Sequence, residues 1–215
     1  MNAKLVNINS KSDCEMLIGR IRGTLQATNP VLLSTIRVVS SQFHKDDRYI
    51  FEQLCKAILS IQAVFGDIQS NLPKIKGILF NYNISQVASL SDNDITKMYN
   101  NNFRPLNIRA RFLKKELTCI RNNAMTFGDI QQKSGSVWEF IEQCIKDKGQ
   151  DGLMKSFIGR GSQFKLDGVG LAVCCEFFNN IGIDEFKPDT HTSRFFKRIG
   201  VAKKVIDQKR LGKLG

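Results

Sequence analysis

The chain has 215 residues, of which 42% are hydrophobic and 24% are charged, and this ordinary globular composition excludes extended disorder. Lys and Arg number 32 against 20 Asp and Glu, which gives a net charge of +12 and a pI near 9.6. Such an excess of positive charge favours a polyanionic partner. No window approaches the roughly 18 apolar residues of a membrane span, and the first residues lack an apolar signal core. We therefore expect a soluble cytoplasmic protein.

Apolar residues recur at helical spacing through most of the chain, whereas the alternating pattern of a strand is scarce. The one β-branched run, residues 37–40, is too short to build a sheet. Ser91 and Asp94 have the spacing of a capping box that opens a helix through Met98. We therefore predict an all-α protein, with helices in chain order over residues 47–62, 91–98, 107–120, 136–146, 171–180 and 190–198.

Three of these predicted helices have an apolar side that we expect to face the core. One of them also has a basic side, whose cations are either solvated or in contact with phosphates. The residues expected to point inward are Ile50, Leu54, Ile58 and Ile61, then Ile108, Phe112 and Leu117, then Trp138, Ile141 and Ile145; the basic side holds Arg109, Arg111, Lys114 and Lys115.

Six cysteines are scattered along the chain, without a CxxC pair and without a Cys/His cluster of zinc-binding spacing. Most of them lie inside apolar helical runs. We expect them to be buried free thiols in a reducing compartment. Their positions are Cys14, Cys55, Cys119, Cys144, Cys174 and Cys175.

The segment LDGVG, from Leu166 to Gly170, stands directly before the helix predicted over residues 171–180. Two glycines one residue apart favour a tight turn with a positive φ or a close backbone approach. Backbone N–H groups that point outward beside a helix N-terminus form an anion-binding arrangement. The alternative for this segment alone is a plain turn between two helices.

Asp189 follows Pro188, precedes Thr190 and His191, and lies 21 residues after Gly168. It has the context of a helix N-cap. The helix dipole at such a position keeps a carboxylate ionised. An ionised carboxylate suits a reaction whose transition state is a cationic sugar.

The two segments together resemble the helix-hairpin-helix DNA glycosylases, which include endonuclease III and 3-methyladenine DNA glycosylase I. The hairpin of that family is similar to LPGVG, where this chain has LDGVG, and its essential aspartate lies in VDTHxxR, where this chain has PDTHTSR. The resemblance extends over roughly residues 46–200. It implies the glycosylase fold, with a six-helix barrel lobe and a second helical lobe.

Under this resemblance the barrel lobe spans residues 47–182 and contains the hairpin. Residues 1–46 with 183–215 then form the second lobe, which carries Asp189 as the catalytic carboxylate. The polar loop 184–188 also favours two lobes. The residues that the resemblance places on DNA are Gly168, Val169, Gly170, Lys165, Gln62, His191 and Arg194, and the candidates for the base pocket are Phe65 and Trp138.

The departures from the family pattern narrow the expected activity. Ala172 stands where members with lyase activity carry a lysine, and alanine cannot form a Schiff base. No cysteine follows Cys175, so we expect no iron–sulfur cluster. The catalytic glutamate of 3-methyladenine DNA glycosylase I, which lies in a Leu-Glu-Gly stretch, is replaced near residues 56–58, so the substrate preference of that enzyme is not carried over. The sequence leaves open whether a monovalent cation binds at the hairpin carbonyls, and otherwise we expect no cofactor.

The resulting expectation is a monofunctional glycosylase that acts as a monomer on double-stranded DNA containing a damaged base, with an alkylated purine as the favoured candidate for that base. Three alternatives stay open. The first is a non-enzymatic helix-hairpin-helix DNA-binding module. The second is a bifunctional glycosylase/lyase that uses a displaced lysine such as Lys165 or Lys187. The third is a helical protein with no role on nucleic acid.

Overall fold

The computed structural model describes residues 45–61 and 63–183, together with five single residues near the N-terminus. The chain divides into two compact units, residues 43–187 with Gly215 and residues 1–42 with 188–214. Residues 45–61 and 63–183 all lie in the first of these units. The helix predicted over residues 190–198 lies outside the described residues, and the division into two glycosylase lobes stays a prediction.

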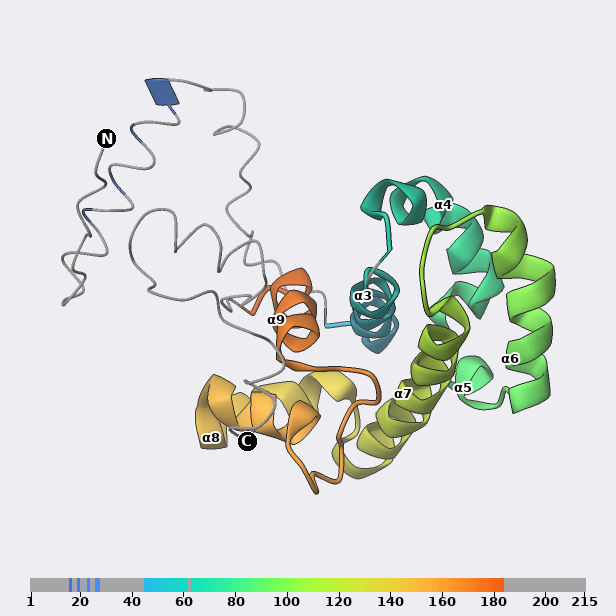
Figure 1. The fold of residues 1–215 in the computed structure, drawn as a ribbon. Helices are drawn as coiled ribbons and strands as arrows, with labels where there is room; N and C mark the ends of the chain where they lie inside the picture. The colour runs from blue at the N-terminus through green and yellow to red at the C-terminus, as the bar shows by residue number, and fades with distance from the viewer. Residues whose placement is uncertain are drawn as a thin grey trace. The chain divides into compact units, whose positions relative to one another are not determined.

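The described residues form seven α-helices and no strand, so the prediction of an all-α protein is confirmed at that level (Figure 1). Three short helical segments of other types join them. In chain order the elements are α3 (Asp47–Leu59), α4 (Phe65–Ile78), η1 (Phe80–Tyr82), α5 (Ile84–Ala88), α6 (Asp92–Met98), the π-helical η2 (Tyr99–Phe103), η3 (Arg104–Leu106), α7 (Leu113–Ser134), α8 (Val137–Ile158) and α9 (Leu171–Asn180).

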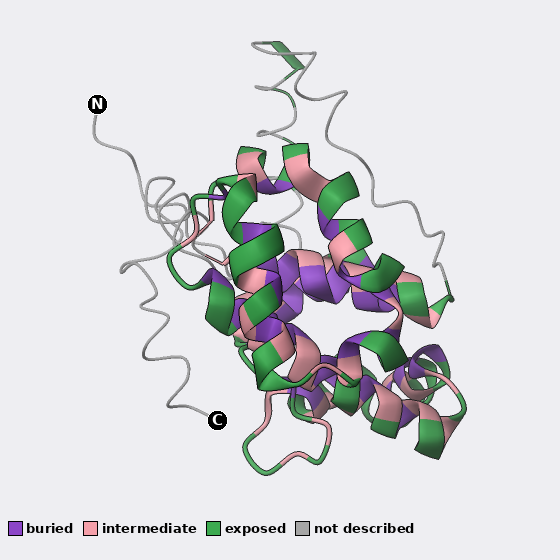
Figure 2. Cartoon of the chain, turned by 90° about the vertical axis from the view of Figure 1, so that its right-hand side faces the viewer, coloured by how far each residue is buried: buried purple, intermediate pink, exposed green. Residues whose placement is uncertain are grey.

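Helix α3 lies between α9 and α7 and also contacts α8 (Figure 1). Its middle and end are almost wholly buried, from Ile50 and Phe51 to Leu59. A helix that is apolar on most of its circumference needs neighbours on several sides. This requirement explains why three later helices pack around α3, whose buried residues belong to the core. The buried residues gather on the inward sides of the helices (Figure 2).

The Asp47 carboxylate joins three helices at the start of α3. It accepts hydrogen bonds from the backbone N–H groups of Val137 (2.9 Å) and Trp138 (3.2 Å) at the start of α8, and from the side-chain amide of Gln131 (2.7 Å) on α7. The first N–H groups of a helix have no partner within the helix. An acidic residue of one helix therefore caps another and fixes the register of α3, α7 and α8.

Three predicted helices agree closely with the structure. The helix predicted over residues 171–180 coincides with α9. The capping box is confirmed, since the Asp94 N–H donates to Ser91 Oγ (3.2 Å) and the Ser91 N–H donates to the Asp94 carboxylate (3.0 Å). Helix α3 begins at residue 47 as predicted, but it ends at Leu59 rather than at residue 62.

The helix predicted over residues 107–120 is wrong at its start. Asn107 has a left-handed backbone with φ 52°, which ends η3 and prevents a continuous helix. Helix α7 begins only at Leu113 and then runs to Ser134, well beyond the predicted end. Helix α8 spans Val137–Ile158, but the non-helical backbone of Gly149 (φ 68°) divides it into two helical segments, so the prediction over residues 136–146 covers most of the first segment and misses the second.

The segment before α7 pairs with the segment after α3 instead of forming a helix. The Val64 N–H donates to the Arg109 carbonyl (3.2 Å), and Ala63 and Ala110 form an isolated bridge. This extended pairing turns Phe112 outward, where 44% of it is exposed. The prediction that Phe112 points into the core is therefore wrong.

No helix in the described part of the chain is both long and apolar enough to cross a membrane.

Candidate functional site

The hairpin between α8 and α9 is anchored by apolar side chains. Leu166 is completely buried, and its N–H donates to the carbonyl of Phe157 near the end of α8 (2.8 Å). Val169 is also buried. The tip of the loop is exposed at Asp167, Gly168 and Gly170. Two buried side chains thus hold a turn whose glycines face solvent.

Asn123 of α7 clamps the backbone of this turn. Its side-chain oxygen accepts from the Asp167 N–H (2.6 Å), and its side-chain N–H donates to the Asp167 carbonyl (3.0 Å). Asn123 itself has no exposed surface. Asn122 adds a bond to the Asp167 carboxylate (2.8 Å). A buried amide that is satisfied on both sides fixes the loop more firmly than packing alone, because breaking either bond leaves a buried polar group unpaired.

The two exposed glycines of the hairpin meet different demands. Gly168 has φ +69°, and a Cβ atom there would lie 2.7 Å from the Cys119 Sγ. Both the backbone angle and the close approach of α7 therefore require glycine. Gly170 has an ordinary φ of −99°, and a Cβ atom there would meet nothing within 4 Å. Nothing inside the described structure requires glycine at 170, whereas close approach of an outside group to the backbone would.

The start of α9 offers backbone N–H groups to solvent. Gly170 is its N-cap residue and no side chain caps the helix. Within the described part of the chain, no acceptor is found for the N–H groups of Gly168, Gly170 and Leu171. Unpaired N–H groups at the positive end of a helix, beside a turn with positive φ, can bind an anion such as a phosphate.

Two titratable groups lie on the inward side of α7, and one of them, Cys119, borders the hairpin at Gly168. Burial, followed by the nearby Asp167 carboxylate, raises the pKa of the Cys119 thiol to about 11. Burial raises the pKa of Glu116 to about 7. Glu116 is only 4% exposed, and neither of its carboxylate oxygens has a hydrogen-bond partner among the described residues. Such a carboxyl group destabilises the fold unless it is protonated.

Three of the residues predicted to bind DNA lie in the described hairpin, and Lys165 is exposed just before it. Gly168 and Gly170 present their backbones to solvent, whereas the Val169 side chain is buried and only its backbone could contact a ligand. Ala172 lies half-buried in the first turn of α9.

Trp138 is buried at the start of α8, away from the contacts that hold the hairpin. Its ring lies under the Lys45 ammonium group, 5.5 Å from the ring centroid, and its backbone N–H donates to Asp47. These contacts belong to the start of α3, whereas the hairpin contacts Phe157 and the middle of α7. A role for Trp138 in a base pocket stays a prediction.

The remaining predicted residues fall outside the description. Asp189, His191, Arg194 and Gln62 lie outside the described residues, as does the side chain of Phe65, whose backbone opens α4. Their predicted roles in catalysis, in DNA binding and in the base pocket are therefore still predictions.

Arg109, a candidate phosphate contact on the predicted basic side, has an internal partner. Its guanidinium Nε and Nη2 donate to the two carboxylate oxygens of Asp67, each at 2.8 Å, and its backbone N–H donates to the same carboxylate (3.0 Å). These bonds lower the pKa of Asp67 to about 2. Arg111 and Lys114 are exposed, as Arg109 is, but no ion pair is found for either of them among the described residues.

Asn123 is the residue at this site that the sequence reasoning missed. The helix predicted over residues 107–120 stopped before it. If that helix is extended, Asn123 falls on the apolar side with Ile120, Phe127 and Ile130. A polar residue on an apolar stripe must find partners, and this requirement is a usable signal.

Among the described residues, no group of three or more His, Cys, Asp or Glu side chains could hold a metal ion. The site therefore consists of a backbone turn, an uncapped helix start and nearby cations. No family model matches the sequence, and no curated protein or solved structure matches it either.

Proposed function

We propose that the protein is a DNA base-excision glycosylase of the helix-hairpin-helix type, with Asp189 as its catalytic carboxylate. One observation supports this function above the others. The LDGVG turn is held rigidly by Asn123, with Gly168 and Gly170 exposed and with N–H groups directed to solvent. This arrangement suits a DNA phosphate, and the net charge of +12 suits a polyanion.

In the proposed reaction the hairpin binds a phosphate of the DNA backbone beside a damaged nucleotide. The base must leave the stack before it can be cleaved, at a cost of a few kcal/mol that is lowest for damaged or mispaired bases. Gln62 then fills the vacated space. This division of labour separates binding, which rests on the hairpin, from chemistry, which rests on Asp189.

Asp189 would stabilise the cationic sugar that forms as the glycosidic bond breaks, and it would orient or deprotonate the water that attacks the anomeric carbon. The products are a free base and an abasic site. Ala172 supplies no amine for a Schiff base, so the DNA strand stays intact. The proposed enzyme is therefore monofunctional, and alkylated purines are the substrates that we would test first.

The test is a base-release assay on end-labelled duplexes that carry a single alkylated, oxidised, deaminated or mismatched base. We expect strand cleavage of one substrate only after treatment with hot alkali, which reveals abasic sites. Cleavage without alkali would show lyase activity, and borohydride trapping would then identify the lysine, with Lys165 and Lys187 as candidates. Failure to release any base, with salt-sensitive DNA binding intact, would contradict the glycosylase and favour a DNA-binding module.

A further inference from the structure

The start of α7 forms a hollow of about 560 Å³ on the surface. Its charged lining residues are Arg111, Lys114 and Lys115, and Phe112, Tyr99 and Thr118 also contribute to its walls. We call this surface the α7 hollow. All three cations are exposed, and no acidic residue lines the hollow.

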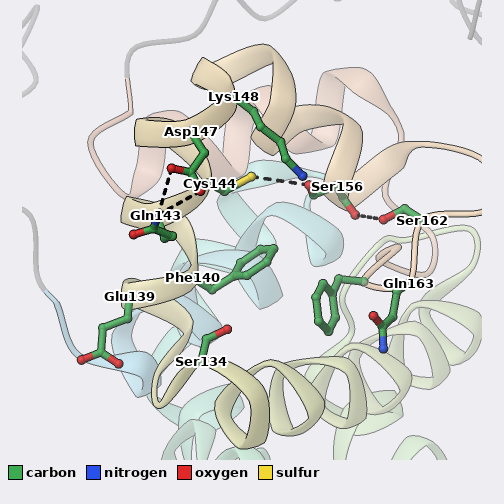
Figure 3. A pocket seen from close by; sticks show the side chains of 11 residues that line it. Ser134, Glu139, Phe140, Gln143, Cys144, Asp147, Lys148, Ser156, Ser162 and Gln163 are labelled. Atoms are coloured by element: carbon green, nitrogen blue, oxygen red, sulfur yellow. Dashed lines mark hydrogen bonds between the residues drawn. The ribbon is translucent and has the colours of Figure 1, made fainter.

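The charge of the α7 hollow differs from that of the other three described hollows. The one of about 550 Å³ along α8 holds Glu139 and Asp147 against a single Lys148 (Figure 3). Its Asp147 carboxylate is already paired with the Gln143 amide (2.8 Å). The other two hollows also contain acidic residues. Only the α7 hollow has a charged lining of one sign, so among these four it is the one that selects an anion.

An exposed aromatic ring lies among these cations. Phe112 is 44% exposed, and the Arg111 guanidinium lies 5.1 Å from its ring centroid. The backbone that presents the ring is pinned by the Ala63–Ala110 bridge and by the Arg109–Asp67 ion pair. Phe112 is thus held outward, which fits a partner with an apolar face as well as negative charge. Nucleic acid offers both, since sugars and bases alternate with phosphates.

The α7 hollow lies at the start of α7, and the hairpin contacts the middle of the same helix. Lys115 is four residues before Cys119, whose thiol borders Gly168, and the charge of Lys115 acts on the Cys119 pKa. Asn122, seven residues after Lys115, bonds to Asp167 of the hairpin. At 1.5 Å per residue, these seven residues correspond to about 10 Å, which equals the rise of about three base pairs along the axis of a duplex. One strand can therefore reach both places.

We propose that the α7 hollow is a second DNA-contact site, in which Arg111, Lys114 and Lys115 bind phosphates next to those held by the hairpin and Phe112 packs against a deoxyribose of the same strand. The inference rests on the proposed function only in that the partner is DNA. It does not require that a base be removed.

The test compares two triple variants of the full chain that lose the same charge. One is R111Q/K114Q/K115Q, and its control is K146Q/K148Q/K155Q, which removes three exposed cations of α8. Affinity for an undamaged duplex is measured by fluorescence anisotropy at several salt concentrations. We expect the α7 variant to bind at least about tenfold more weakly than the control, with a salt slope lower by about 2 to 3 because each lost phosphate contact removes about 0.9.

A variant of Phe112 tests the apolar part of the proposed contact separately from the charged part. Phe112→Ser should weaken duplex binding severalfold while leaving the salt slope unchanged, because the lost contact is apolar. Thermal unfolding of each variant shows that it is folded. Equal affinities of the two triple variants would overturn the proposal. Weakened binding by the α7 variant in a protein that releases no base would support the hollow and reject only the glycosylase.

Discussion

Asn123 and Glu116 lie seven residues, or about two turns, apart on the inward side of α7, and both are polar and buried. The Asn123 amide is satisfied on both sides by the Asp167 backbone, whereas the Glu116 carboxylate has no partner among the described residues. One group therefore stabilises the hairpin, and the other costs stability whenever it is charged. Burial of a polar group says little about stability until its partners are known.

The largest expected effect comes from removing the satisfied group. Asn123→Ala removes both hydrogen bonds that the fully buried Asn123 side chain makes with the N–H and the carbonyl of Asp167. We expect the free energy of unfolding to fall by about 4 kcal/mol. Asn122→Ala, which removes one bond to the exposed Asp167 carboxylate, should cost under about 1 kcal/mol. Chemical denaturation of both variants measures the difference, and equal losses would show that Asn123 does not clamp the hairpin.

The unsatisfied group should show itself in the pH dependence of stability. The pKa of Glu116 is about 7 in the folded protein against 4.5 for an ordinary glutamate. The folded state therefore holds the proton more tightly, and stability is lost as the pH rises from 4.5 to about 7. The full loss is about 3 kcal/mol.

Glu116→Gln removes the titration while keeping the shape of the side chain. We expect the variant to be more stable than the wild type above pH 7, with a difference that shrinks toward acid pH. Denaturation midpoints measured from pH 4 to pH 8 test this expectation. A difference between the two proteins that stays constant with pH would mean that Glu116 is ionised or paired in the folded state.

Alanine substitutions at the two hairpin glycines test how the backbone of the hairpin contributes to stability and to DNA binding. Gly168→Ala adds a side chain at a positive φ and against Cys119, so we expect a loss of about 2 kcal/mol. Gly170→Ala should change stability by no more than about 0.5 kcal/mol, because the loss of unfolded-state entropy offsets the poorer cap. We expect Gly170→Ala to weaken DNA binding even though it barely changes stability, because the added methyl group obstructs the approach of a phosphate to the exposed backbone. Wild-type affinity of Gly170→Ala would argue against a hairpin grip.

The smallest effect concerns the Arg109–Asp67 pair, in which the Arg109 side chain is exposed and the Asp67 side chain is mostly covered. The hydrogen bonds from Arg109 hold the pKa of Asp67 at about 2. This depressed pKa contributes stability that is present above the ordinary pKa of 3.8 and lost as the pH falls through about 2. In Arg109→Gln the pKa of Asp67 should return toward its ordinary range, as carboxyl titration by NMR would show. An unchanged pKa would mean that another group stabilises the Asp67 carboxylate.

The sequence predicted the helices that have regular apolar spacing and clear ends. Helix α9 coincides with its predicted range, and the capping box at Ser91 is present. Helix α4 was not predicted, because Gly66, Pro73 and Gly77 interrupt its pattern. The start of α7 was misplaced because the pairing of Ala63 with Ala110 is a long-range contact that no local pattern contains.

The candidate site was predictable only in its local part. The turn at Gly168 and the uncapped start of α9 follow from the glycine spacing, since a positive φ at a loop favours glycine. The clamp by Asn123 could not be predicted, because it joins residues 44 positions apart. The engagement of Arg109 by Asp67 is of the same kind, at 42 positions. Charge and periodicity identify a basic side of a helix, but only the fold shows which cations are free to bind a ligand.

The central claim is that Asp189 performs the chemistry while the hairpin performs the binding. The most direct measurement compares wild type and Asp189→Asn on one duplex that carries a single alkylated purine, with single-turnover base release and anisotropy measured on the same samples. We expect base release to fall at least about a thousandfold while the Kd changes by no more than about threefold. Release at the wild-type rate by Asp189→Asn would contradict the assignment of the catalytic residue.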